Sequence, residues 1–127
     1  MVNEATLQNG IREHLARVQG LRSYAFAPSG THGPLHGVLP TGWPDLLIIV
    51  PSERLYGYGP EESSALHFWF EVKTSRGKPT AGQPEMQDEL REQGVRVEVI
   101  QSDDTTEACR QVERVLRDEG VVLREWE

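Results

Sequence analysis

The sequence predicts an α/β domain with a mixed central β-sheet flanked by helices. Segments with helical periodicity begin and end the chain, and strand-like runs lie between them. The clearest of these runs are the apolar LLIIV at 46–50 and the alternating FWFEVKT at 68–74. The predicted order is helix, strand, strand, strand, helix, strand, helix, which favours one mixed sheet with helices on its faces.

The 127 residues fit a single domain, spanning 1–127, with one core. No apolar run approaches the length of a membrane span, and the start of the chain lacks the pattern of a signal peptide. The single cysteine, Cys109, excludes an internal disulfide framework and suggests a reducing compartment. We therefore expect a soluble cytoplasmic protein.

The net charge of −7 argues at first against a nucleic-acid partner. The charge is unevenly distributed, however: residues 1–80 hold seven basic and seven acidic residues, whereas residues 81–127 hold six and thirteen. We expect the acidic excess to lie on solvated faces of the C-terminal helices. The first two-thirds of the chain can then contact a polyanion.

The first predicted helix begins after Asn3, a good N-cap, and ends at Gly20. Its apolar positions recur at helical spacing: Leu7, Ile11, Leu15 and Val18. The alternating LRSYAFA at 21–27 predicts a strand, and the Gly- and Pro-rich stretch at 28–42 predicts a mobile loop. DLLIIV, at 45–50, is continuously apolar after its first residue, which predicts a strand buried on both faces.

The second predicted helix follows the aromatic strand. Thr80 is expected to cap this helix, with Gln83 at the capping-box position, and Gly94 is expected to end it. Pro84 falls in the first turn, where a proline is tolerated because the N–H it lacks would have no helical partner. VRVEVI, at 95–100, alternates in apolar character and predicts the last main strand.

The C-terminal part of the chain predicts one further helix. Asp103 or Asp104 is expected to cap this helix, and Gly120 is expected to end it. VVLREW, at 121–126, is expected to add a short edge strand.

Charged residues interrupt the aromatic strand near its end. Glu71 and Lys73 point to the same face because residues two apart in a strand share a face, while Trp69 on that face is expected to belong to the core. Asp45 opens the apolar strand directly after Pro44, which restrains the backbone. If the two strands pair, Asp45 meets Glu71 and Lys73. Two neighbouring carboxylates favour a hard divalent cation, and a lysine beside them can position or deprotonate a water for phosphodiester hydrolysis.

Simpler explanations exist for each of these residues taken alone. Glu71 and Lys73 can form a strand-end ion pair of little energetic value, and Asp45 can be a turn residue after a proline. Gln83 and Glu4, which lie on helix faces that can face the sheet, have simpler explanations too. Gln83 can serve only as a helix cap, and Glu4 suits a helix N-terminus because of the helix dipole. The ordered combination of all these residues favours the catalytic interpretation.

The ordered motifs resemble the VRR-NUC family of the PD-(D/E)xK nuclease superfamily. The resemblance rests on EATLQNGIREHL, GWPDLL, FEVKT, GKPTAGQPEMQDELREQG and VEVIQS, and it covers roughly residues 4–118. It implies a restriction-endonuclease-like core and a metal-dependent endonuclease. It also implies that Asp45 and Glu71 bind Mg²⁺ or Mn²⁺ with the Val72 carbonyl, and that Lys73 assists the attacking water.

The resemblance assigns roles to residues on two helices as well. A glutamine on the second helix is implied beside the site, and Gln83 fits this position better than Gln87. Glu4 matches an acidic residue on the first helix of the family and is a further candidate metal ligand. Arg76 and Lys78, just beyond Lys73, are expected to contact DNA phosphates.

Resemblance to single-domain family members implies an enzyme of DNA repair that cuts branched DNA, with a Holliday junction as the leading candidate. Two symmetric cuts require two sites, so we expect a homodimer. Candidate interface residues are Leu35, Val38, Leu39, Val121, Val122 and Trp126. The alternatives are a catalytically inactive nucleic-acid-binding or interaction module, and a nuclease that acts on RNA or duplex DNA.

Overall fold

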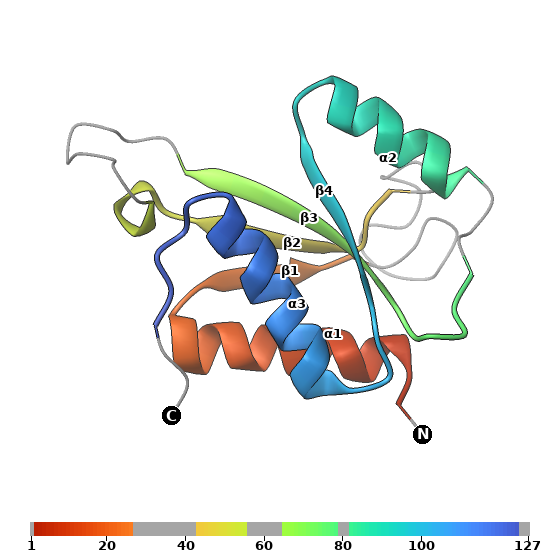
Figure 1. Cartoon of the computed structure of the whole chain (residues 1–127), viewed down its shortest axis with the longest axis horizontal. Coiled ribbons are helices and arrows are strands. Elements are labelled where there is room, and N and C mark those ends of the chain that lie inside the picture. The colour runs from red at the N-terminus through yellow and green to blue at the C-terminus, as the bar shows by residue number, and fades with distance from the viewer. Residues whose placement is uncertain (1, 27–42, 56–64, 79–81, 125–127) are drawn as a thin grey trace.

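The computed structural model describes residues 2–26, 43–55, 65–78 and 82–124 (Figure 1). The predicted order of helices and strands is confirmed, and the loop predicted at 28–42 lies outside the described residues. The elements are α1 (Glu4–His14), a π-helical turn η1 (Leu15–Gln19), β1 (Arg22–Ala25), β2 (Leu46–Val50), a 3₁₀ turn η2 (Ser52–Arg54), β3 (Leu66–Lys73), α2 (Gln83–Glu92), β4 (Arg96–Gln101) and α3 (Thr105–Asp118).

The four strands form one mixed sheet in the order β1-β2-β3-β4, which confirms the predicted α/β class. β2 is antiparallel to both of its neighbours, whereas β3 and β4 are parallel. Leu46 lies opposite Phe70, and Lys73 lies opposite Gln101. Side chains alternate between the two faces, so Phe68, Phe70 and Val72 share one face of β3, and Trp69, Glu71 and Lys73 share the other.

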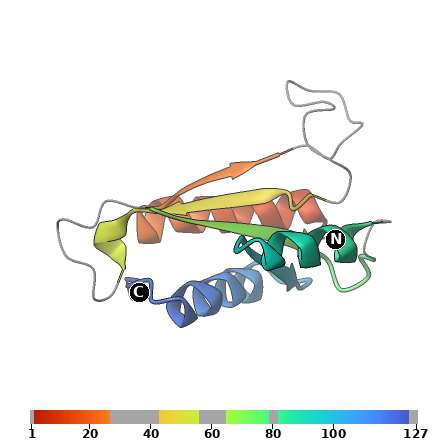
Figure 2. The ribbon, with the colours of Figure 1, turned by 90° about the horizontal axis from the view of Figure 1, so that it is seen from above.

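The main core lies between the Phe70 face of the sheet and two helices. α1 and α3 pack against each other over this face, and Figure 2 shows α3 beside the twisted layer of strands. In Figure 1, β4 runs between α3 on its left and α2 on its right, so α2 is separated from the other two helices. In the part of the chain that the structure describes, no helix is long and apolar enough to cross a membrane.

β2 is not buried on both faces, contrary to the prediction. Leu46, Ile48 and Val50 are fully buried, whereas Leu47 and Ile49 are only half-buried. The reason is that α1 and α3 cover one face, while α2 packs on β4 and not on β2. The continuous apolar run therefore marks a strand with one deeply buried face.

Most predicted helix ends are confirmed. The Asn3 side chain caps α1 by accepting a hydrogen bond from a backbone N–H, and Gly20 follows η1 in the left-handed conformation. Of the two alternatives for α3, Asp104 is the cap. Gly94 and Gly120, both at φ 90°, follow α2 and α3 as predicted.

Two further predicted features are wrong. The capping box of α2 does not form, because Gly82 is the N-cap and Gln83 is the first helical residue, with no side-chain bond to the cap. Thr80 lies outside the described residues. The tail does not form an edge strand within its described part, where Val121 makes a single β-bridge with Leu55.

The candidate interface residues fall into three groups. Val121 is buried in the main core, so it is not available to a partner. Val122 is half exposed, at 50%. Leu35, Val38, Leu39 and Trp126 lie outside the described residues.

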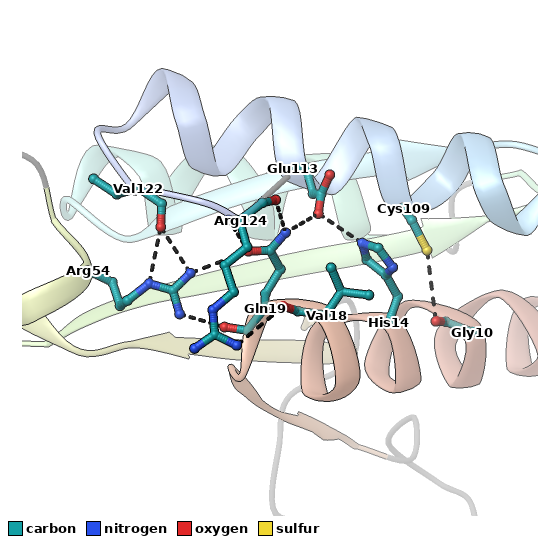
Figure 3. A network of polar contacts seen from close by, with 9 residues as sticks. All are labelled: Gly10, His14, Val18, Gln19, Arg54, Cys109, Glu113, Val122 and Arg124. Atoms are coloured by element: carbon teal, nitrogen blue, oxygen red, sulfur yellow. Dashed lines mark hydrogen bonds and ion pairs between the residues drawn. The ribbon is translucent and has the colours of Figure 1, made fainter. Parts of the chain in front are cut away.

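A buried polar network connects the end of α1 to α3 and to the C-terminal segment (Figure 3). Gln19 Nε2 donates to Glu113 Oε2 at 2.7 Å and to the Arg124 carbonyl at 2.9 Å. Gln19 Oε1 accepts from the Arg124 N–H at 2.7 Å, and Arg54 donates to the Gln19 carbonyl. His14 Nε2 lies 2.8 Å from the same Glu113 oxygen. The network satisfies polar groups that would otherwise be buried without partners.

Gln19→Leu should lower the free energy of unfolding by about 3 kcal/mol. The variant removes the N–H donor to buried Glu113 and the two hydrogen bonds that Gln19 makes with the carbonyl and the N–H of Arg124. Urea unfolding followed by circular dichroism measures this loss. The control is Glu13→Gln, which breaks only the exposed pair with Arg17 and should cost less than about 0.5 kcal/mol. Equal losses in the two variants would contradict the role assigned to Gln19.

Candidate functional site

The pairing of β2 with β3 brings the two predicted carboxylates together. Because Leu46 lies opposite Phe70, the next opposing positions are Asp45 and Glu71, and opposed residues share a face of the sheet. The two carboxyl groups are close enough to hydrogen-bond to each other. Two residues that are 26 positions apart in the sequence therefore form one acidic pair.

Burial changes the protonation of both carboxyl groups. Burial raises the pKa of Asp45 to about 6, although a hydrogen bond with the Val72 backbone works in the opposite direction. The pKa of Glu71 is raised to about 8, first by burial and then by the charge of Asp45, while the charge of Lys73 opposes the rise. Two carboxylates at this position are costly to ionise together unless a cation lies beside them.

Lys73 lies between two carboxylates. Its Nζ is 3.8 Å from Glu71 Oε2 and 3.7 Å from Glu4 Oε1. The Lys73 side chain is only 11% exposed, whereas that of Glu4, in the first turn of α1, is 42% exposed. The structure thus brings Glu4 to the site through an ion pair with Lys73, and its role as a metal ligand stays a prediction.

Gln83 contacts the acidic pair directly. From the first residue of α2, its Nε2 donates to Glu71 Oε1 at 2.6 Å, and both side chains are buried. Gln87, one turn later, is also buried, but the hydrogen bond to Glu71 comes from Gln83. The contact explains why Gln83 does not cap its own helix: its amide holds one Glu71 oxygen in place.

The donor set fits a hard divalent cation. Asp45 Oδ1 is buried and has no hydrogen-bond partner in the described part of the chain. Mg²⁺ is commonly held by one or two carboxylates together with water. No three side chains of His, Cys, Asp or Glu form a metal-binding group among the described residues. A cation here would therefore depend on Asp45, Glu71, a backbone carbonyl such as that of Val72, and water.

The two predicted DNA-binding residues, Arg76 and Lys78, are exposed beyond the end of β3. The turn that begins this segment is firmly anchored, because the Asp103 carboxylate accepts from both the N–H and the hydroxyl of Ser75. Gln101 Nε2 donates to three carbonyls of the turn, those of Thr74, Ser75 and Gly77. These anchors are not predicted from the sequence, in which Asp103 is expected only as a helix cap.

The turn lies directly against the Lys73–Glu4 ion pair. A Cβ added at Gly77 would lie 3.2 Å from Glu4 Oε1 and 3.3 Å from the Lys73 Cβ, closer than ordinary contacts. Glycine therefore allows the turn to approach the site without displacing either side chain.

Aromatic residues next to the acidic pair were also missed. Trp69, predicted to belong to the core, is only half-buried. Its ring packs against those of Phe26 and Trp43. The available signal was that Trp43 and Trp69 each precede a site carboxylate by two residues.

In EDTA at pH 7, Asp45→Asn should raise the free energy of unfolding by about 1–2 kcal/mol, because the fold holds an ionised Asp45 whose pKa is raised from 3.8 to about 6. Below about pH 4 the carboxyl is protonated in both states, so the gain should vanish there. The gain in the free energy of unfolding should grow between pH 3.8 and about pH 6, where Asp45 is ionised only in the unfolded state. Above this range the gain should be complete. Urea unfolding at pH 3.5 and pH 7 measures the difference.

The control for this prediction is Asp88→Asn, which changes an exposed carboxylate paired with Arg91 on α2. This variant should change stability by less than about 0.5 kcal/mol at pH 7. A gain for Asp45→Asn that is the same at pH 3.5 and pH 7 would contradict the raised pKa of Asp45.

Comparison with known proteins does not assign the chain to a family. No protein-family model matches it, and no curated protein matches it either.

Proposed function

We propose that the chain is a Mg²⁺- or Mn²⁺-dependent endonuclease with a restriction-endonuclease-like core, which hydrolyses phosphodiester bonds in DNA. The convergence of Asp45, Glu71 and Lys73 on one face of the sheet carries this proposal. Partly or fully desolvated carboxyl groups with raised pKa values cost stability, and such groups concentrate at functional sites. The ordered motifs that resemble the VRR-NUC family support the same function.

Each residue of the site has a role in this proposal. Asp45 and Glu71 hold the cation together with the Val72 carbonyl. When bound, the cation supplies positive charge that offsets the charge developing on the phosphate. Gln83 keeps the Glu71 carboxylate in one orientation through its 2.6 Å hydrogen bond. Lys73, held between two carboxylates, orients the attacking water or donates to a phosphate oxygen.

The substrate is proposed from the resemblance to be branched DNA, with a Holliday junction as the first candidate. A homodimer would supply the two sites that symmetric cutting of such a junction needs, and we place this activity in the cytoplasm. Arg76 and Lys78 would contact DNA phosphates from their anchored segment. The chemistry of the site does not depend on these choices, because any phosphodiester strand offers the same reacting group.

Asp45→Asn should abolish cleavage while leaving the protein folded and able to bind DNA, because it removes one of the two carboxylates proposed to hold the cation. The measurement is a panel of labelled four-way junction, flap, duplex, single-stranded DNA and RNA substrates, each with and without Mg²⁺. Asp88→Asn, an exposed change on α2, should cut at the wild-type rate. Cleavage by Asp45→Asn at the wild-type rate, or none by the wild-type chain with Mg²⁺ or Mn²⁺, would reject the proposal.

Lys73→Ala should slow the chemical step by about 100-fold, the scale of assistance by a positioned acid or base. Single-turnover cleavage at saturating enzyme measures the chemical step, and anisotropy in Ca²⁺ measures DNA affinity. Affinity should fall much less than the rate. A loss of affinity with an unchanged single-turnover rate would make Lys73 a phosphate-binding residue instead.

A further inference from the structure

Three aromatic side chains lie beside the acidic pair. The Phe26 N–H donates to the Asp45 carbonyl at 2.8 Å, so Phe26 continues the β1–β2 pairing and lies opposite Asp45. Trp69 precedes Glu71 by two residues in β3 and shares its face of the sheet. Trp43 precedes Asp45 by two residues and contacts Trp69. We call Phe26, Trp43 and Trp69 the aromatic shelf.

The aromatic shelf has a defined geometry with Trp69 at its centre. The Trp69 ring centroid is 5.4 Å from that of Phe26, with the rings tilted by 41°, and 5.7 Å from that of Trp43, with the rings perpendicular at 89°. Aromatic pairs prefer such tilted and edge-to-face arrangements, which hold the three rings in position. All three residues are half-buried, and none belongs to the main core cluster.

Two buried polar atoms in the described part of the chain lack hydrogen-bond partners, and both belong to the aromatic shelf or the acidic pair. One is Asp45 Oδ1, an acceptor, and the other is Trp43 Nε1, a donor. Buried polar groups are nearly always paired, so an unpaired donor and an unpaired acceptor two residues apart point to a ligand. The cation proposed above would satisfy Asp45, but it cannot satisfy an indole N–H.

We propose that the aromatic shelf binds an unpaired nucleobase of the strand whose phosphodiester lies at the acidic pair, an inference that rests on the proposed nuclease function. A nucleobase offers a flat face for stacking on the rings and ring or carbonyl acceptors for the Trp43 N–H. Two residues along a strand span ~6.6 Å, which is comparable to the separation of a phosphate from its own base. An aliphatic side chain of a protein partner would leave the indole N–H unpaired.

The aromatic shelf deepens the proposed function by naming a feature of the substrate. A base inside a duplex is stacked on both sides, so it must leave the stack before it can occupy the aromatic shelf. Stacking accepts any of the bases because each has a π face. The substrate is therefore a nucleic acid with an unpaired nucleotide next to the cut, whatever its sequence.

The test uses Asp45→Asn, which should bind without cutting, and two fluorescent single strands of equal length. One strand is oligothymidine, and the other has the same backbone with abasic nucleotides. Anisotropy titration should show about tenfold tighter binding of oligothymidine. Adding Trp69→Leu should remove this preference without weakening abasic binding, whereas Trp69→Phe should retain most of it because a ring remains.

Glu13→Gln is the control, because it changes an exposed side chain on α1 that pairs with Arg17 away from the acidic pair, and it should leave the preference unchanged. If Trp69→Leu does not fold, Phe26→Leu tests the aromatic shelf from another ring and should reduce the preference. Equal affinity of Asp45→Asn for both strands, or a preference that survives Trp69→Leu, overturns the inference. If the preference depends on the ring but the wild-type chain cuts no substrate, the proposed nuclease function is wrong, whereas base binding by the aromatic shelf is supported.

Discussion

The antiparallel register of β2 and β3 is the constraint on which the site depends. It places Leu46 opposite Phe70, and both side chains are fully buried in the core. A slip of one residue would turn every side chain of one strand to the other face of the sheet. The burial of the Phe70 face therefore also sets the positions of Asp45 and Glu71, which lie one residue further along on the opposite face.

Stabilising and destabilising groups lie on opposite faces of the sheet. The main core, under α1 and α3, and the network around Gln19 contain satisfied and well-packed groups. The opposite face carries buried Glu71 and half-buried Asp45, both with raised pKa values, and the unpaired indole N–H of Trp43. A ligand that binds only the folded state stabilises it, so a cation or a nucleotide at this face would offset part of the cost.

The surroundings of the acidic pair differ on its two sides. The aromatic shelf lies on one side, toward the start of β3, and the anchored turn with Arg76 lies on the other, beyond its end. In the proposed function, a base would occupy the first side and a neighbouring phosphate the second. Both sides have contacts of their own: ring packing on one, and hydrogen bonds with Asp103 and Gln101 on the other.

Local patterns in the sequence were enough to predict the order of elements, most helix ends and the shared face of Glu71 and Lys73. These features depend on near neighbours: Asn3 and Asp104 cap their own helices, and side chains alternate along a strand. Long-range packing was needed for the rest. Three features depend on register and on where α2 packs: the half-buried side of β2, the orientation of Gln83 toward Glu71, and the contacts among Phe26, Trp43 and Trp69. No local pattern contains that information.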